Sequence, residues 1–193
     1  MAIRSFLAFE LPRQMKDIVS GISAGMRAVL PEARWVRVDH IHLTVVFLGQ
    51  IPESSLEGIA DVAKSVCDRY DSFEIALKGA GVFSGLRNPR VLWVGLQGEL
   101  ERMGYCRNAL QKRLTPFGIK KENRKFRPHL TLCRFRKGAK SGPQLVKILD
   151  GYREISSPFF RLNALSLFKS DLTSRGSIYT RLTAWPLAGK KQE

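Results

Sequence analysis

The stretch Phe126-Arg127-Pro128-His129-Leu130-Thr131-Leu132 repeats a tripeptide that occurs earlier in the chain, at His42-Leu43-Thr44. The chain contains only three histidines, so two of them open the same His-Leu-Thr sequence. With ordinary usage of Leu and Thr, this coincidence has a chance probability on the order of one in ten thousand. We therefore interpret the repeat as a functional signal. The third histidine, His40, is not followed by Leu-Thr, and we interpret it as structural.

Both copies lie in apolar runs of the kind that forms strands, at 41–48 and 129–135. Alternate side chains of a strand share one face, so each histidine is expected beside its threonine while the leucine between them enters the core. Each copy would then present an imidazole and a hydroxyl together.

This pairing suits in-line displacement at phosphorus. An imidazole titrates near neutrality, and a hydroxyl can donate a hydrogen bond to a charged oxygen without competing for that proton. One of His42 and His129 would deprotonate the attacking group while the other protonates the leaving oxygen. Thr44 and Thr131 would hold the phosphoryl oxygens.

The net charge indicates a polyanionic partner. The 193 residues include 32 Lys and Arg against 17 Asp and Glu, a formal net charge of +15. Such an excess attracts RNA, although a generally basic surface is the simpler explanation. The basic residues gather between Lys112 and Lys140, where Glu122 is the only acid. We therefore expect a basic rim around the second motif.

Length and cysteine content predict a single domain over residues 1–193 that needs neither disulfides nor metal to fold. Cys67, Cys106 and Cys133 are odd in number and widely spaced, so we expect reduced thiols and no metal site. The apolar run within residues 1–11 is too short for a secretory signal, and no apolar run of the sequence is long enough to span a membrane. We expect a cytoplasmic protein without a membrane partner.

Periodicity predicts an α+β fold. Alternating and apolar runs indicate strands, and apolar residues at spacings of three and four indicate helices. The expected strands are 3–10, 35–38, 41–48, 73–82, 91–95, 129–135, 159–168 and 177–184, and the expected helices are 12–30, 53–70, 99–114 and 141–152. A polar tail, 189–193, is expected to be frayed. The order falls into two similar halves, which predicts a bilobal internal duplication: two antiparallel sheets facing a central groove, with helices outside.

The motifs, together with residues 4–12, 35–49, 89–95 and 179–182, resemble the two-histidine phosphoesterases. The most similar branch is the RNA 2',3'-cyclic phosphodiesterase family, also called 2'-5' RNA ligase. The resemblance covers nearly the whole chain, and it implies the same bilobal fold.

The resemblance also implies an activity. RNA ending in a 2',3'-cyclic phosphate, such as a tRNA fragment, would be hydrolysed to a 2'-phosphate, with His42 as the general acid toward O3' and His129 as the base toward water. The reverse reaction would join RNA ends weakly through a 2'-5' bond without ATP. No cofactor or metal is implied, and we expect a monomer.

Two further site residues follow from the resemblance. Arg134 matches an arginine of the family's second motif that contacts the phosphate or stacks on the base. Phe47 occupies the equivalent place after the first motif, where it could stack on a nucleobase. Strict alternation from His129 places Cys133 rather than Arg134 on the catalytic face. Arg134 and Phe47 therefore require a bulge or a reach around the strand edge.

Other functions share parts of this pattern. Another two-histidine enzyme would use the same chemistry on ADP-ribose cyclic phosphate, on a cyclic nucleotide, on 2'-5' oligoadenylate or on an RNA tail. A non-catalytic RNA-binding module would need only the basic stretch, but it would leave the paired motif unexplained.

Overall fold

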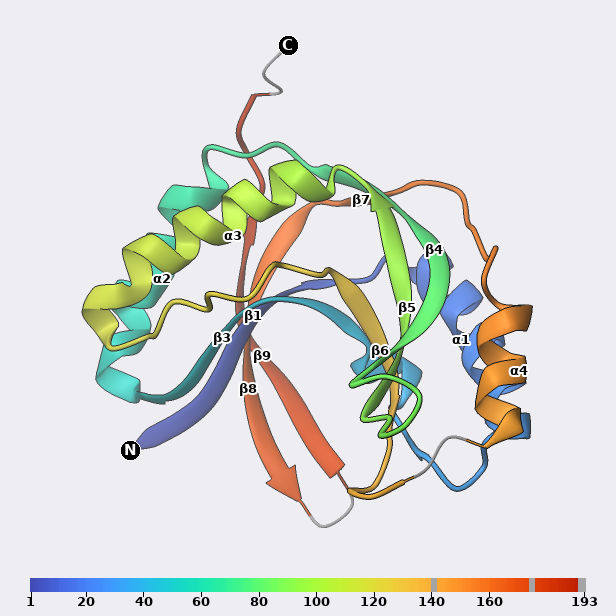
Figure 1. Cartoon of the computed structure of the whole chain (residues 1–193). Coiled ribbons are helices and arrows are strands. Elements are labelled where there is room, and N and C mark those ends of the chain that lie inside the picture. The colour runs from blue at the N-terminus through green and yellow to red at the C-terminus, as the bar shows by residue number, and fades with distance from the viewer. Residues whose placement is uncertain (140–141, 174–175, 191–193) are drawn as a thin grey trace.

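A computed structural model describes residues 1–139, 142–173 and 176–190. Two antiparallel sheets form its centre, with strand orders β3-β1-β8-β9 and β2-β6-β5-β4-β7 (Figure 1). The strands are β1 Ala2–Glu10, β2 Arg34–Trp35, β3 His42–Pro52, β4 Phe73–Phe83, β5 Val91–Gly98, β6 His129–Arg134, β7 Phe160–Leu162, β8 Ala164–Thr173 and β9 Gly176–Pro186. The predicted α+β class with two antiparallel sheets is confirmed.

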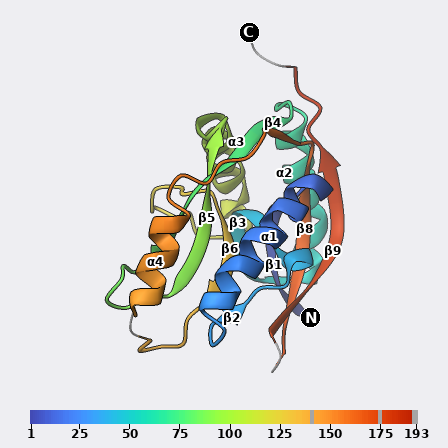
Figure 2. The same ribbon diagram turned by 90° about the vertical axis from the view of Figure 1, so that its right-hand side faces the viewer.

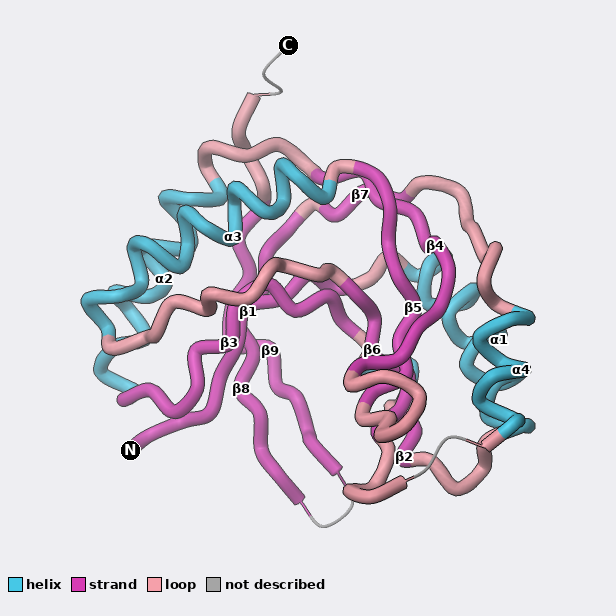
Figure 3. Tube along the Cα trace, in the orientation of Figure 1, coloured by secondary structure: helices cyan, strands magenta, loops and turns pink. Residues whose placement is uncertain are grey.

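The α-helices lie outside the sheets. In the described residues they are α1 Arg13–Val29, α2 Leu56–Cys67, α3 Leu100–Leu114 and α4 Pro143–Gly151. The helices α2 and α3 lie together on one side, and α1 and α4 on the other (Figures 1 and 2). The strands fill the space between them (Figure 3). Ser141, which was expected to begin the last helix, lies outside the described residues.

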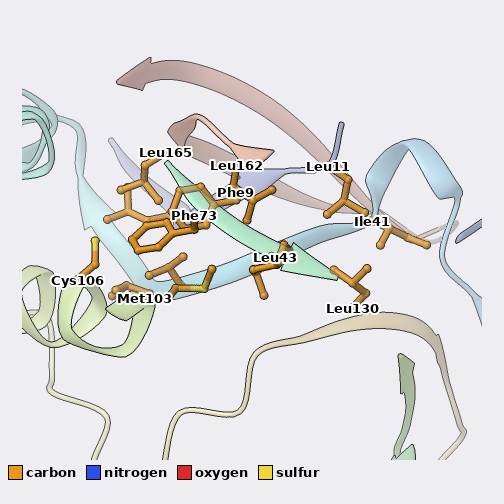
Figure 4. Packing of buried hydrophobic residues seen from close by; sticks show 14 of the residues in the cluster. Phe9, Leu11, Ile41, Leu43, Phe73, Met103, Cys106, Leu130, Leu162 and Leu165 are labelled. Carbon is orange, nitrogen blue, oxygen red and sulfur yellow. The ribbon is translucent and has the colours of Figure 1, made fainter. Parts of the chain in front are cut away.

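The helices dock through apolar stripes. In α1, Met15, Val19, Ile22 and Met26 recur at spacings of three and four, and all are buried. This stripe faces the core while the rest of the helix is largely solvent-exposed. Leu43 and Leu130, the leucines inside the two His-Leu-Thr copies, are also fully buried in the same core (Figure 4). Their burial confirms the predicted inward direction of both leucines.

Apart from the 3-10 helices, the short strands β2 and β7 and the last strand β9, the chain runs through the same element order twice, as β1-α1-β3-α2-β4 and then β5-α3-β6-α4-β8. In each half the first two strands pair with each other, β1 with β3 and β5 with β6. The third strand instead joins the other half's sheet: β4 pairs with β5, and β8 pairs with β1. Each sheet is therefore completed by a strand from the other half of the chain.

Two predicted strands were wrong where the chain changes sheets. The predicted strand 35–38 is only β2, because the chain turns through a 3-10 helix, Val38–His40, before it enters β3 in the other sheet. The predicted strand 159–168 is divided at Asn163, since β7 pairs with β4 and β8 pairs with β1. The chain thus passes from one sheet to the other at Asn163.

Two smaller features also differ from the prediction. The helix predicted from residue 53 begins as a 3-10 turn, Glu53–Ser55, before α2. Near the C-terminus, the Gly189 amide donates a hydrogen bond to the Tyr70 carbonyl at 3.0 Å, so the predicted frayed tail is held there. Residues 191–193 lie outside the described residues.

Candidate active site

The two motif histidines are held by the same backbone device. His42 Nδ1 lies 2.7 Å from the His40 carbonyl oxygen, and His129 Nδ1 lies 2.7 Å from the Arg127 carbonyl oxygen. A carbonyl oxygen can only accept, so Nδ1 carries the hydrogen in both rings. Each neutral ring therefore has its lone pair at Nε2. His40 contributes its backbone carbonyl, a role that its side chain did not signal.

A β-bulge follows each His-Leu-Thr copy at the same position. In the pairing of β1 with β3, Leu7 opposes Val46 and Ala8 opposes Thr44, which leaves Val45 as the extra residue. Leu132 is the extra residue in β6. Each bulge reverses the alternation of faces beyond it.

The bulges bring the fifth residue after each histidine to the face of the motif side chains. Phe47 follows two buried residues and is 66% exposed. Arg134 likewise follows two buried residues and is exposed, whereas Cys133 is buried. The bulge that Phe47 and Arg134 require is thus present in both strands.

The two motif strands come together. β3 and β6 contact each other although they belong to different sheets. Thr44 and Thr131 are half-buried beside their histidines, as the alternation predicted. The charge of Arg134 lowers the pKa of both His42 and His129, and the charge of His129 lowers that of His42, so these three groups lie within electrostatic range of one another.

Burial makes both imidazoles weak bases. The pKa of His42 is lowered to about 4, chiefly by burial. The bond to the His40 carbonyl acts in the opposite direction, and the positive charges of Arg134, His40 and His129 lower the value further. Burial also lowers the pKa of His129, against the bond to Arg127, and Arg134 adds to the effect. Both rings are consequently neutral in the free protein at pH 7.

Aromatic side chains from three strands surround His42. Phe6 of β1 stacks on its ring with centroids 4.6 Å apart and an interplanar angle of 23°. The edge contact with Tyr179 of β9 has a centroid distance of 5.1 Å, and Phe168 of β8 lies at 6.0 Å. These rings exclude water from the imidazole, which explains its strongly lowered pKa.

The surroundings of His129 are different. Phe83 of β4 makes an edge contact with its ring at 4.7 Å, and Trp93 of β5 lies behind Phe83 at 5.4 Å. A Cβ atom at Gly81 would lie 2.3 Å from the Trp93 ring, so glycine makes room for the indole. Among the residues that the structure describes, His129 thus contacts one aromatic ring and His42 contacts three.

A small cavity of about 60 Å³ adjoins His42 and includes Lys16, Asp39 and Tyr179 in its lining. Glu10, also in the lining, accepts hydrogen bonds from Arg181 Nη1 at 2.8 Å and from Ser166 Oγ at 3.2 Å. Because the cavity is lined by residues around His42 alone, it does not outline the predicted groove between the sheets.

Comparison with known proteins places this arrangement in a family. A family model described as the 2'-5' RNA ligase superfamily matches residues 23–173. The chain belongs to this superfamily. Two relatives, each named RNA 2',3'-cyclic phosphodiesterase, come from Methanothermobacter thermautotrophicus and Aeropyrum pernix. They are 30% and 33% identical, with 97% and 88% of this chain aligned to 100% and 90% of those proteins.

Solved structures agree with the fold of this 2'-5' RNA ligase superfamily member. The TT0787 protein of Thermus thermophilus superposes with a TM-score of 0.78 at 23% identity, covering 97% of this chain and 100% of that one. Escherichia coli LigT complexed with 3'-AMP gives 0.76 at 24% identity, with coverage of 97% and 99%. These similarities support the architecture.

Several residues of this superfamily member's site carried no sequence signal. Alternation along β1 shows that Phe6 and Glu10 lie on the same face, but not that this face meets His42. The strand pairing alone brings Phe83, Phe168 and Tyr179 to the histidines. Among the described residues, no three His, Cys, Asp or Glu side chains gather where they could hold a metal ion. In the same part of the chain, no helix is long and apolar enough to cross a membrane.

Proposed function

We propose that this protein is an RNA 2',3'-cyclic phosphodiesterase that uses His42 and His129 as general acid and base. The observation that supports this most is the doubled site, with each imidazole fixed through Nδ1 and left with Nε2 for proton transfer. Family membership and the names of the relatives agree with it. A non-catalytic RNA-binding module would not need two matched imidazoles.

In the proposed reaction the cyclic phosphate lies between the two motif pairs. Water attacks phosphorus in line, His129 Nε2 takes the water proton, and the bond from phosphorus to O3' breaks. His42 gives O3' a proton, so the products are a 2'-phosphate and a 3'-hydroxyl. Thr44 and Thr131 donate hydrogen bonds to the phosphoryl oxygens, and the Arg134 guanidinium balances their charge.

The low pKa of His42 gives this mechanism a further requirement. His42 is neutral in the free protein, and the acid must be protonated before O3' leaves. An anion next to an imidazole favours the imidazolium form. His42 therefore takes up its proton together with the negatively charged substrate, and binding of the cyclic phosphate at pH 7 should consume protons.

The substrate is proposed to be an RNA end, including tRNA fragments that end in a cyclic phosphate. Phe47, which is exposed and lies 6.4 Å from the Phe6 ring that stacks on His42, would stack on the terminal base. The same two histidines can also open the ring with a 5'-hydroxyl in place of water: the P–O3' bond breaks, O3' takes a proton, and a 2'-5' bond forms without ATP. Ligation would be weak because water greatly exceeds any RNA end in concentration.

We place the protein in the cytoplasm as a monomer. Cys67, Cys106 and Cys133 are buried as free thiols, and burial raises the pKa of each to about 12. Such thiols are poor nucleophiles and remain reduced there. The chemistry proposed for the site needs no metal and no other cofactor.

Identification of the product isomer tests the activity. The protein is incubated with an oligoribonucleotide ending in a 2',3'-cyclic phosphate, and the product is compared with 2'- and 3'-phosphate standards. We expect the 2'-phosphate. A 3'-phosphate product would mean that O2' rather than O3' is the leaving group. If neither RNA nor a cyclic mononucleotide reacts, the proposed function is excluded.

A sulfur leaving group tests the order of acid and base. When O3' of the cyclic phosphate is replaced by sulfur, the leaving thiolate needs little protonation. His42→Ala should then regain much of its lost rate on the thio substrate, while His129→Ala should not. Selective rescue of His129→Ala would assign the acid role to His129.

A further inference from the structure

The connector between α3 and β6, residues 118–128, contains no helix or strand but is anchored at both ends. Ile119 is buried in the core at 4% exposure. The Phe126 ring lies under the guanidinium of Arg107, 5.1 Å from its centroid, and Arg107 also donates to the Glu122 carbonyl at 3.5 Å. Arg107 is itself 6% exposed. The connector is thus pinned to α3 along its length and crosses the front of the molecule toward β6 (Figures 1 and 3).

The outer side of the connector is positively charged. Lys120, Lys121, Lys125 and Arg127 are exposed. The connector's one carboxylate, Glu122, is occupied by Arg124 Nε at 2.7 Å. In the described part of the chain, none of the four exposed cations has a carboxylate within ion-pair distance. Their charge is available to an external anion. Lys140, at the end of the basic stretch in the sequence, lies outside the described residues.

The exposed cations of the connector begin close to His129 in the sequence. Arg127 uses its carbonyl to hold His129 Nδ1, while its side chain is exposed. Lys125 is four residues from His129, so their Cα atoms are at most about 14 Å apart. An extended polyanion whose end lies at His129 would therefore pass within reach of these cations.

We propose that the connector binds the phosphodiester backbone of the RNA strand immediately 5' of the cyclic phosphate. This inference rests on the proposed function, and it adds that the preferred substrate is an oligonucleotide rather than a cyclic mononucleotide. The anchored loop presents its charges without first having to be ordered, so little binding energy is lost to ordering. These contacts are with the phosphate charges of the backbone, so they do not depend on the base sequence of the RNA.

The salt dependence of RNA binding sets how much affinity the connector lysines should contribute. Each phosphate neutralised on a single strand contributes about −0.7 to the slope of log affinity against log salt. The three lysines together would account for a slope of about −2. That slope corresponds to a loss of roughly 10- to 100-fold in affinity at 0.1 M salt when all three charges are removed.

The experiment compares two variants on two substrates. The test variant is Lys120→Gln/Lys121→Gln/Lys125→Gln. The control is Arg27→Gln/Lys147→Gln/Arg153→Gln, which removes the same charge from exposed positions on and beside α1 and α4 (Figure 2). The substrates are a 2',3'-cyclic mononucleotide and a single-stranded ten-nucleotide RNA with the same end, and kcat/KM is measured from 0.05 to 0.4 M salt.

We expect the test variant to lose roughly 10- to 100-fold in kcat/KM on the RNA at 0.1 M salt, with a shallower salt slope, while its mononucleotide kcat/KM stays within about twofold. The control should match wild type on both substrates. Equal RNA activity in test and control variants would overturn the inference. Equal losses on both substrates would also overturn it, because the lysines would then act through the site. Failure of wild type on both substrates would instead contradict the proposed function.

Discussion

The two halves of the site share a backbone but differ in their side chains. In both, the imidazole Nδ1 bonds to the carbonyl two residues before it, and an extra residue bulges from the strand three positions after it. Around His42 the surroundings are aromatic, and the fifth residue is Phe47. Around His129, Phe83 is the one aromatic ring in contact among the described residues, and the fifth residue is Arg134.

The position of each imidazole and its proton affinity are set by different parts of the molecule. Backbone devices fix where each Nε2 lies, and they are the same in both halves. The side chains then set how readily each imidazole is protonated, and they differ. An acid and a base must differ in protonation at the start of a reaction, so a symmetric scaffold becomes useful only through its unequal surroundings.

The largest effect should come from removing either imidazole. His42→Ala and His129→Ala should each lose about 10²- to 10⁴-fold in kcat on cyclic-ended RNA, because each removes one proton transfer. The double variant should fall well short of the product of the two losses, since the groups act in one transition state.

His40→Ala serves as the control, because alanine keeps the backbone carbonyl that holds His42 Nδ1. Its kcat should change little. A folded His42→Ala that stays active while His40→Ala is inactive would move the site to a different strand.

The fifth residues should differ in which kinetic constant they change. Arg134→Ala should lose roughly 10²-fold in kcat, because a charge that stabilises the phosphoryl oxygens is removed. Phe47→Ala should raise KM by about tenfold with little change in kcat, since base stacking is lost. Steady-state kinetics on a cyclic nucleotide separates the two. Loss of kcat in Phe47→Ala would contradict the stacking role.

The pH profile of kcat/KM should be a bell that lies on the acid side of neutrality. One histidine must be protonated and the other neutral, so kcat/KM is bell-shaped. The acid limb should lie near pH 4, the pKa of His42, and the alkaline limb below 6.5, because the pKa of His129 is lowered from that value. Above the alkaline limb, kcat/KM should fall about tenfold per pH unit. An optimum above pH 7 would contradict the burial of both rings.

Titration of the histidine NMR signals in the free protein would sharpen this comparison. Phe6→Leu should raise the pKa of His42 alone, because a smaller side chain admits water to that ring, and Phe83→Leu should raise that of His129 alone. Arg134→Ala should raise both, since its charge lowers both. A shift of both signals in Phe6→Leu would show that the two environments are not separate.

The smallest expected effect is that of a chelator. His42, His129, the two threonines and Arg134 supply the proton transfers and positive charge that the proposed reaction needs. Extended treatment with EDTA should therefore leave kcat unchanged within error. A loss that Mg²⁺ or Zn²⁺ restores would replace the two-histidine mechanism with a metal-assisted one.

The part of the fold that depends on local pattern could be predicted from the sequence. The strands at 41–48 and 129–135 and the helix stripe from Met15 to Met26 follow from alternation and from spacings of three and four, and the structure confirms them. The bulges were required by Phe47 and Arg134, but their places at Val45 and Leu132 emerge only from the register.

The rest depended on contacts distant in sequence. No local pattern tells that the run at 159–168 divides at Asn163, because the division is set by which sheet each part joins. For the same reason Tyr179 and Phe83 could not be assigned to His42 and His129. Their positions depend on strand pairing across the whole chain.

The exchange of third strands between the halves has a consequence for ancestry. A half-length precursor containing one His-Leu-Thr copy could not complete its own sheet, because the strand beside its first strand would have to come from another molecule. Two precursors that traded these strands would form a homodimer with identical histidines about a twofold axis. Fusion of the two genes would then let the positions of Phe47 and Arg134 diverge, a freedom that a homodimer encoded by one gene does not have.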